Sequence, residues 1–405
     1  MARSPFSAVP LAPRDPILGV TEAFNADSRP TKVNLGVGVY YDENGKLPLL
    51  DCVRQAEDQI NAAHAPRGYL PIDGLPAYDQ AVQRLLLGND ARAIADRRVI
   101  TAQALGGTGG LKIGADLLRR FTSADTRVYI SDPSWENHRA IFEGAGFTVQ
   151  TYPYYDASTH GVRFEEMLAC IRQAAAGSIF VLHACCHNPT GVDLDAGQWS
   201  QVLAALQAGE HIPFLDIAYQ GFGDGIAEDG AVIRAFADAG IPFLVSSSFS
   251  KSFSLYGERV GALTAVLSSA DEASRVQSQL KRVIRANYSN PPTHGGQVVQ
   301  HVLNDATLRQ RWESELAAMR TRIKAMRRAL VAGLAAAGLQ RDFSFIEQQR
   351  GMFSYSGLSA DQVEHLKTDR GIYAVSSGRI CVAALNQKNV ERVANAIAEV
   401  LKKGA

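Results

Sequence analysis

The 405-residue sequence has no imbalance of charge, because its 41 lysines and arginines equal its 41 aspartates and glutamates. A neutral chain offers no broad positive field for nucleic acid or for acidic membrane surfaces. The sequence also lacks any apolar run near the roughly 18 residues that a membrane-spanning helix needs, and residues 1–20 hold no unbroken apolar segment typical of a secretory signal. We therefore expect a soluble, cytoplasmic protein with no nucleic-acid or membrane partner.

Cysteine is scarce, at five residues, and the count is odd. Two of the five, Cys185 and Cys186, are adjacent, and adjacent cysteines rarely bridge each other. The pattern favours reduced thiols over a disulfide framework. The remaining composition, 46% hydrophobic and 20% charged, is that of an ordinary globular protein, and the length favours two domains.

Short apolar runs alternate with helix-like segments between residues 98 and 267. Five of these runs have the pattern of strands buried on both faces, at residues 127–130, 178–183, 212–218, 241–248 and 260–267. The segments between them carry apolar residues three and four positions apart, as helices do. The region is predicted to be an α/β layered domain with a parallel sheet flanked by helices.

The pattern changes after Pro292. Residues 307–339 place apolar side chains on one stripe, which predicts one or two long helices. Two strand-like stretches follow at 343–348 and 378–385, and an amphipathic helix is expected over 389–403. We expect this part to form a second, smaller domain, joined by the N-terminal segment.

Three polar residues follow predicted strands, and each could carry chemistry. Lys251 comes just after a buried strand, where lost hydration would lower its pKa and give the free amine that Schiff-base chemistry needs. Asp216 ends another strand and could face a cationic ring nitrogen, or cap a helix. Asn188 precedes Pro189, which favours extended or turn backbone and directs the amide beyond the strand ends. Open α/β sheets bind ligands there.

A glycine-rich segment, residues 106–110, comes just before a helix-like pattern. Its bare backbone N–H groups and the helix dipole could bind a phosphate. It fits neither the GxGxxG pattern, because Lys112 stands at the third glycine position, nor the Walker pattern, because Leu111 precedes that lysine. The segment indicates a phosphate site without a dinucleotide or nucleoside-triphosphate signature, or a plain turn.

Two arginines and a tryptophan complete the candidates. Arg285, in RANYSNPP, and Arg379, at the start of an apolar strand, could each bind a carboxylate with two hydrogen bonds. Trp135 follows the strand at 127–130 and could stack on a flat ring. Taken singly, each arginine could equally be an ordinary surface charge, and the tryptophan could equally be a packing residue.

Ten motifs that cover nearly the whole chain resemble, in the same order, those of one family. They are VNLGVGVY, GYLPIDG, GGTGG, DPSWENH, CCHNPTG, DIAYQGFG, SFSKSFSLYGERVG, RANYSNPP, GMFSYSGL and SGR. The sequence resembles the fold-type-I pyridoxal-phosphate aminotransferases of class I, in the aspartate and aromatic amino acid subgroup. The resemblance implies a large cofactor-binding domain, 48–305, with a mostly parallel seven-stranded sheet flanked by helices. A smaller α/β domain would come from residues 1–47 and 306–405.

The resemblance implies pyridoxal 5'-phosphate as cofactor and no metal. Lys251 would hold it as an internal aldimine, and Asp216 would keep its ring nitrogen protonated. The other residues that the resemblance assigns to the cofactor are Gly107, Thr108, Ser248 and Arg259 at the phosphate, with Tyr69 from a partner subunit, Asn188 and Tyr219 at the phenolic oxygen, Trp135 on the ring face, and His183 and His138 in support of Asp216.

The resemblance also implies the substrate contacts and a homodimer with shared active sites. Arg379 would bind the α-carboxylate with help from Gly38, beside Trp135 and Asn188, and Arg285 of the partner would meet a distal carboxylate. Catalysis would be ping-pong through aldimine and ketimine, with Lys251 moving the Cα proton and Asp216 and Tyr219 assisting. The substrates would be small amino acids and 2-oxo acids.

Substrate preference stays open between two subgroups. Tyr41 after Tyr40, and Leu47, resemble the bacterial aromatic enzymes, whereas Thr108 and RANYSNPP resemble the aspartate-specific ones. We favour an aromatic amino acid aminotransferase that acts on tyrosine, phenylalanine and aspartate with 2-oxoglutarate. A dedicated aspartate aminotransferase is the alternative.

Interpretations from other classes use fewer of these residues. Ser248 and Lys251 form an SxxK pair, and residues 288–290 and 367–368 follow in the order found in serine acyl-enzymes, although the third motif lacks its glycine. That interpretation leaves Asp216 unused. A lyase or decarboxylase could share the lysine and the aspartate, but two carboxylate-binding arginines favour transamination. A nonenzymatic regulator would need a partner-binding segment, and the sequence offers none.

Overall fold

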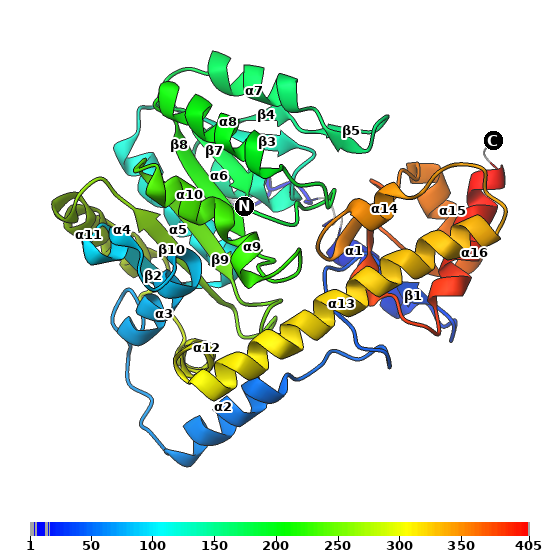
Figure 1. Cartoon of the computed structure of the whole chain (residues 1–405), viewed down its shortest axis with the longest axis horizontal. Coiled ribbons are helices and arrows are strands. Elements are labelled where there is room, and N and C mark those ends of the chain that lie inside the picture. The colour runs from blue at the N-terminus through cyan, green and yellow to red at the C-terminus, as the bar shows by residue number, and fades with distance from the viewer. Residues whose placement is uncertain (1–3, 5, 13–14, 16, 404–405) are drawn as a thin grey trace.

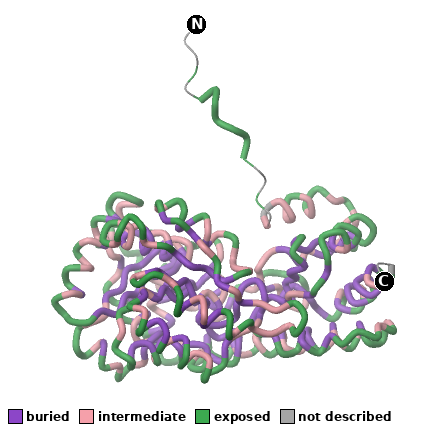
Figure 2. Tube along the Cα trace, turned by 90° about the horizontal axis from the view of Figure 1, so that it is seen from above, coloured by how far each residue is buried: buried purple, intermediate pink, exposed green. Residues whose placement is uncertain are grey.

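The computed structural model describes residues 4, 6–12, 15 and 17–403. A large α/β part and a smaller part lie side by side, and the 31-residue helix α13 (Ala306–Ala336) runs across both (Figure 1). Figure 2 shows that the buried residues gather in the interior and that the exposed residues lie along the outside. The domain limits predicted above stay a prediction, and part of segment 1–47 lies outside the described residues.

A seven-stranded sheet forms the centre of the large part, in the order β2-β10-β9-β8-β7-β3-β4. Its strands are β2 (Val99–Leu105), β3 (Arg127–Asp132), β4 (Thr148–Pro153), β7 (Ile179–His183), β8 (Ile212–Ile217), β9 (Phe243–Ser248) and β10 (Val260–Val266). β10 runs antiparallel to both of its neighbours, β2 and β9, and the other neighbouring strands of this sheet are parallel to each other. The prediction of a mostly parallel seven-stranded sheet is confirmed, and β2 and β4 add to the five predicted runs.

Helices cover both faces of this sheet (Figure 1). The helices of the large part are α2 (Asp51–Ala62), α3 (Pro76–Leu87), α4 (Arg92–Ala95), α5 (Gly106–Phe121), α6 (Glu136–Gly144), α7 (Phe164–Gln173), α8 (Ala196–Ala208), α9 (Ile226–Asp229), α10 (Ala231–Asp238), α11 (Ala270–Asn287) and α12 (Thr293–Asn304), with a small hairpin of β5 (Tyr155–Asp156) and β6 (Gly161–Val162). Phe214 and Leu215 are neighbours on β8 but pack into two different hydrophobic cores. Successive strand residues point to opposite faces, so a strand between two helical layers must be apolar at every position.

The glycine-rich segment belongs to α5 rather than preceding it, since that helix begins at Gly106. A Cβ at Gly110 would lie 2.7 Å from Ser246 Oγ and 2.9 Å from the carbonyl oxygen of Ala262. Glycine therefore lets the first turn of α5 pack directly on β9 and β10. The prediction of a turn before the helix is corrected by these contacts.

The smaller part is built from both ends of the chain. It contains α1 (Leu18–Ala26), β1 (Val33–Asn34), α14 (Phe345–Gln348), β11 (Phe353–Tyr355), α15 (Ala360–Arg370), β12 (Ile372–Tyr373), β13 (Arg379–Cys381), the 3-10 helix η1 (Val382–Ala384) and α16 (Val390–Lys403). β1 pairs with β12 and β11 pairs with β13. The predicted apolar stripe is buried along one continuous helix, α13.

Two strand predictions in this part need correction. Residues 343–348 hold a short helix, α14, because Asp342 accepts a hydrogen bond from the Ser344 backbone N–H at 2.8 Å and so begins a turn. Residues 378–385 are a strand only over 379–381, after which the chain turns into η1.

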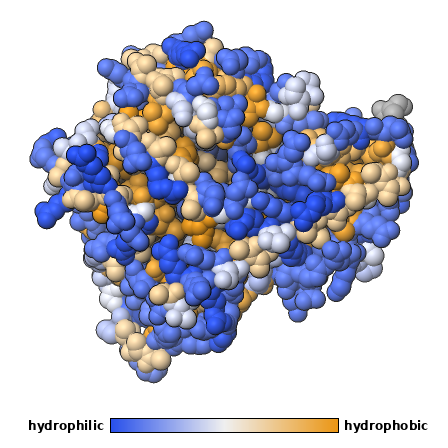
Figure 3. All heavy atoms as spheres, viewed as in Figure 1, coloured by the Kyte–Doolittle hydropathy of each residue, from blue (hydrophilic) through white to orange (hydrophobic). Residues whose placement is uncertain are grey.

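The outer surface is largely hydrophilic on the face in Figure 3, with hydrophobic residues gathered in small patches. Large hydrophobic side chains that are exposed are Phe6, Val9, Leu11, Leu47, Leu49, Tyr69 and Phe121. In the described part of the chain, no helix has the length and apolar character needed to cross a bilayer. All five cysteines are free thiols, as expected.

Candidate active site

A cleft of about 360 Å³ lies at the carboxyl ends of the central strands, where the smaller part meets the sheet. Twelve of the fifteen residues singled out from the sequence line it: Gly38, Gly107, Thr108, Trp135, His183, Asn188, Asp216, Tyr219, Ser248, Lys251, Arg259 and Arg379. The strand register brings them together, because His183 of β7 pairs with Asp216 of β8, which in turn pairs with Ser246 of β9. Ligands of open α/β sheets bind at this edge.

Lys251 lies in the turn that follows β9, with Nζ 4.8 Å from the centre of the Tyr219 ring. Burial lowers the pKa of this lysine to about 8, and the positive charges of Arg259 and Arg379 act in the same direction, against the pull of Asp216. A large fraction of the side chain is therefore a neutral amine near pH 8. That amine is a nucleophile and a base within the cleft.

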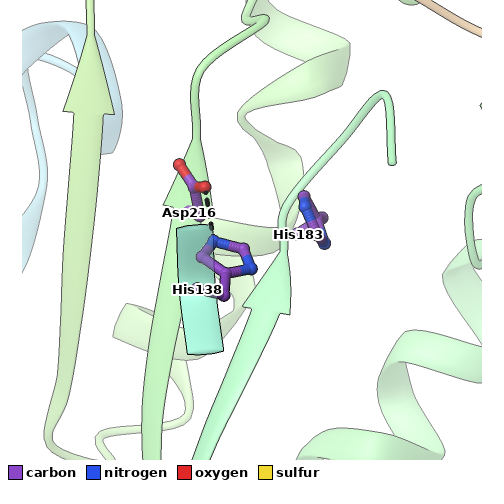
Figure 4. Close-up of side chains that lie close together, drawn as sticks. All are labelled: His138, His183 and Asp216. Carbon is purple, nitrogen blue, oxygen red and sulfur yellow. Dashed lines mark hydrogen bonds and ion pairs between the residues drawn. The ribbon is translucent and has the colours of Figure 1, made fainter. Parts of the chain in front are cut away.

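Asp216 is held by a chain of two hydrogen bonds, of which Figure 4 shows the one to His138. Its Oδ2 lies 2.9 Å from His138 Nε2, and His138 Nδ1 lies 2.9 Å from Ser134 Oγ. Burial by itself raises the pKa of Asp216, but the hydrogen bond and charge of His138, with His183 and Lys251, bring the net pKa below its usual value. The carboxylate is thus ionised although it is only 5% exposed.

His183 stands beside this pair, with its ring 4.9 Å from that of His138. Burial lowers the pKa of His183 to about 3, and the charge of His138 adds to the effect, so the imidazole is neutral. Neither ring nitrogen has a hydrogen-bond partner among the described residues. A buried polar group without a partner is uncommon, so this side chain is suited to contact a bound molecule.

One end of the cleft is suited to an anion. Gly107 and Thr108 lie in the first turn of α5, and no side chain caps that helix, so its positive dipole end and N–H groups are available. Arg259 lies beside them at the rim and donates hydrogen bonds to Ser250 Oγ at 3.3 Å and to the Tyr256 carbonyl at 3.1 Å. A Cβ at Gly106, which has φ +69°, would lie 2.5 Å from this guanidinium, so only glycine allows the approach.

The other end holds a buried arginine. Arg379 is 1% exposed and donates to Asn188 Oδ1 at 3.0 Å and to the Gly36 carbonyl at 2.7 Å. Its guanidinium carbon lies 4.3 Å from the centre of the Phe353 ring. Its Nε has no partner among the described residues, which leaves a donor for an anionic ligand such as a carboxylate.

Trp135 and Tyr219 form aromatic walls between the two ends. Trp135 is the residue before α6 and meets the His138 ring edge to face, with centres 5.3 Å apart. Tyr219 is buried, which raises the pKa of its hydroxyl, so the group stays protonated and can donate a hydrogen bond. Its ring meets Phe353 edge to face at 5.7 Å.

Three of the predicted residues do not line the cleft of this single chain. His138 lies behind Asp216, as described above. Tyr69 is 95% exposed, and Arg285 is exposed on α11, where it donates a hydrogen bond to Ser289. The prediction that a partner subunit supplies the latter two stays a prediction.

The sequence analysis missed several cleft residues, including Ser250, Tyr256 and Phe353. Tyr256 accepts a hydrogen bond from the backbone N–H of Tyr40 at 3.0 Å. Tyr256 and Ser250 stand inside the motif that contains Lys251, and Phe353 stands inside GMFSYSGL. The motifs marked the right segments, but apolar and hydroxyl residues in them carried no separate chemical signal.

The family model and the known proteins that are similar to this chain all describe aminotransferases. Residues 30–397 match the model of a family described as aminotransferase class I and II. The chain is 65% identical to an aspartate aminotransferase of Pseudomonas aeruginosa, over 98% of this chain and 99% of that protein. It is 53% identical to an aromatic-amino-acid aminotransferase of Escherichia coli, over 96% and 98%. A solved aromatic-amino-acid aminotransferase from Burkholderia pseudomallei, covalently bound to pyridoxal phosphate, matches with a TM-score of 0.96 and 65% identity, over 98% of this chain and 100% of that one.

Proposed function

The chain belongs to the class I and II aminotransferase family, and from this premise we propose that it moves the amino group of tyrosine, phenylalanine and aspartate to 2-oxoglutarate in a ping-pong reaction. One observation carries the proposal: the amine of Lys251, the ionised Asp216 and the buried Arg379 share a single cleft. Together they supply a nucleophile, a partner for a cation and a site for a carboxylate. An amino acid needs all three when it reacts with a cationic aldehyde cofactor.

The enzyme uses pyridoxal phosphate, and the cleft fits it. The open first turn of α5 beside Arg259 suits a phosphate, and the lowered pKa of Lys251 suits reaction with an aldehyde. The unpartnered nitrogens of His183 suit contact with a polar ring. When bound, the cofactor supplies the aldehyde that condenses with amines and the cationic ring that accepts the electrons of the Cα–H bond.

The residues of the chain then have separate tasks. Asp216 keeps a proton on the ring nitrogen, because its negative charge is fixed within the cleft by His138. Lys251 would act on the substrate Cα proton, first as base and then as acid. Tyr219 and Asn188 would hold the phenolic oxygen by donating hydrogen bonds, and Trp135 would cover the ring face.

Arg379 orients the substrate by binding its α-carboxylate, with Gly38 next to it. A Cβ at Gly38 would lie 2.6 Å from the Phe353 ring, so glycine lets that ring pack closely beside Arg379. A guanidinium that is already fixed by Asn188 and Gly36 loses little freedom when it binds a carboxylate.

We propose that a second copy of the chain completes the site, with Tyr69 at the phosphate and Arg285 at a distal carboxylate. Two features support this homodimer: both side chains are exposed in the single chain, and Leu47 and Leu49 are large exposed hydrophobic residues. The cytoplasmic location expected from the sequence stays a prediction.

The proposal is tested by a substrate panel of aspartate, tyrosine and phenylalanine, each with 2-oxoglutarate, in the wild type and in Arg285→Leu. We expect all three to react in the wild type. The substitution should lower kcat/KM for aspartate by about two orders of magnitude, because a distal carboxylate would lose its bidentate partner. For phenylalanine, which has no distal carboxylate, the loss in its own half-reaction should be no more than about threefold.

The matched control is Arg282→Leu, at an exposed arginine one turn earlier on the same helix. This substitution should leave kcat/KM unchanged for both aspartate and phenylalanine. Equal losses for aspartate and phenylalanine would refute the role of Arg285. Turnover of aspartate alone would favour a dedicated aspartate aminotransferase. No transamination with any pair would refute the proposed function.

The serine acyl-enzyme interpretation gains no support from the geometry. Lys367 lies on α15 and pairs with Glu364, and Tyr288 donates a hydrogen bond to the Gln103 carbonyl. Neither residue lines the cleft that holds Ser248 and Lys251. The three motifs of that interpretation are not brought together.

A further inference from the structure

Arg327 is a buried arginine near the middle of α13, only 1% exposed. Its guanidinium donates three hydrogen bonds, and all three acceptors are backbone carbonyl oxygens. They belong to Ile346 at 3.0 Å, Gly351 at 2.8 Å and Phe353 at 2.6 Å. A buried charge is unfavourable unless its donors are satisfied, and here one side chain ties together both ends of the segment 346–353.

The segment 346–353 contacts two parts of the chain that hold cleft residues, the turn after Asn188 and the strand of Arg379. The N–H of Arg350 donates to the Gly191 carbonyl at 2.7 Å, which links the segment to the turn after Asn188. Phe353 begins β11 and pairs with Cys381 of β13, the strand that carries Arg379. A Cβ at Gly351, which has φ +77°, would lie 2.5 Å from Cys186 Cβ. The segment therefore packs against Cys186 too closely for a residue larger than glycine.

The ring of Phe353 is the point where this segment meets the site. It lies 4.3 Å from the guanidinium carbon of Arg379 and 5.7 Å from the Tyr219 ring, and it fills the space next to Gly38. Three residues that the proposed function assigns to substrate and cofactor therefore touch one phenyl ring. The carbonyl of that same residue accepts the shortest hydrogen bond of Arg327.

We infer that Arg327 is a positioning residue for substrate carboxylate binding: through the segment 346–353 it fixes the Phe353 ring against the guanidinium of Arg379. This inference rests on the proposed function. A carboxylate is bound well only by a guanidinium whose plane is already oriented, and a fixed aromatic face restricts that plane. Arginine suits the task because three carbonyls in different directions need a planar fork of donors, which lysine lacks.

The experiment compares Arg327→Lys and Arg327→Met with the control Arg328→Met, an exposed neighbour on the same helix. For each cofactor-loaded protein we would measure KM and kcat with aspartate and phenylalanine, and the Kd of succinate, a dicarboxylate that cannot react, by calorimetry. Cofactor content and the unfolding midpoint would be measured alongside. For both Arg327 variants we expect KM and the succinate Kd to rise about tenfold while kcat changes less than about twofold. Arg328→Met should match the wild type.

A second comparison uses Phe353→Leu, alone and combined with Arg327→Lys. If both residues act through the same ring, the double variant should bind succinate no more weakly than the weaker single variant. Effects that multiply in the double variant, or an unchanged KM and Kd in the single Arg327 variants, would overturn the inference. So would insolubility of every Arg327 variant while Arg328→Met folds, because the role would then be in folding. A wild type that transaminates nothing would instead refute the proposed function.

Discussion

Lys251 and Asp216 at one end of the cleft, and Arg379 and Phe353 at the other, are held by different kinds of structure. Asp216 lies near the end of β8, and Lys251 lies in the turn that follows the neighbouring strand β9 of the same sheet. The second pair depends on segments far apart in the chain: Arg379 bonds to Gly36, 343 residues away, and to Asn188, 191 residues away.

This difference separates two tasks. The sheet end carries Lys251 and Asp216, whose positions relative to the reacting atoms must stay fixed. The strands of the sheet fix those positions. The arginine end is assembled where the smaller part meets the sheet, so its geometry depends on how the two parts lie together. Changes at the sheet end should therefore abolish the reaction, whereas changes at the arginine end should weaken substrate binding and leave the cofactor in place.

The largest effect is expected for Lys251→Ala. Loss of the amine removes both the covalent bond to the cofactor and the base for the Cα proton, so kcat should fall by about four orders of magnitude. Steady-state kinetics with aspartate and 2-oxoglutarate would measure this, and borohydride reduction followed by peptide mapping would show the cofactor attached at residue 251 in the wild type only.

Lys388→Ala, a change at an exposed lysine, should keep full activity and labelling. A cofactor label on any other peptide of the wild type would contradict the role assigned to Lys251. So would a Lys251→Ala protein that keeps more than about a hundredth of the wild-type activity, because the sheet end would then not be essential for the reaction.

A smaller effect of a different kind is expected for Arg379→Lys. Lysine keeps the charge but cannot offer a planar pair of donors, so KM for amino acids and for 2-oxoglutarate should rise about a hundredfold. Cofactor content, measured by absorbance after desalting, should equal that of the wild type, because the sheet end is intact. Arg341→Lys, at an exposed arginine, should change neither KM nor cofactor content. Loss of cofactor in Arg379→Lys would contradict the proposal that the arginine end binds substrate and the sheet end binds cofactor.

The same contrast explains what could be predicted from the sequence. The strand that carries Asp216 and the strand that precedes Lys251 are continuous apolar runs, so their ends could be located and the polar residues there expected to converge at one edge. The motif order then indicated the family. The roles assigned to Arg379 and Gly38 came from the family resemblance rather than from any local pattern.

Other features depend on contacts that no local pattern contains. Phe353 looks like an ordinary core residue and Arg327 like a surface charge. Only the fold brings Phe353 to the cleft and the guanidinium of Arg327 to the Phe353 carbonyl. Residues 343–348 have the apolar character of a strand, but the Asp342 side chain accepts a hydrogen bond from the Ser344 backbone N–H and begins the turn that leads into α14. Tyr69 and Arg285 face outward, so their roles depend on a second chain, and one sequence or one chain leaves them predictions.

The smallest effect is that of the charge of Arg379, at one end of the cleft, on the pKa of Lys251, at the other end. Burial and the nearby arginines lower the pKa of Lys251 to about 8, so below that pH the amine is protonated and cannot attack an aldehyde. The rate at which cofactor-free protein takes up pyridoxal phosphate should rise about tenfold per pH unit up to about pH 8 and then level off, as stopped-flow absorbance would measure. A lysine with an ordinary pKa of about 10.4 would keep gaining rate beyond pH 9. Because Arg379 contributes to the lowering, Arg379→Met should move the plateau to higher pH, and an unmoved plateau would mean that the arginine end acts on substrate alone.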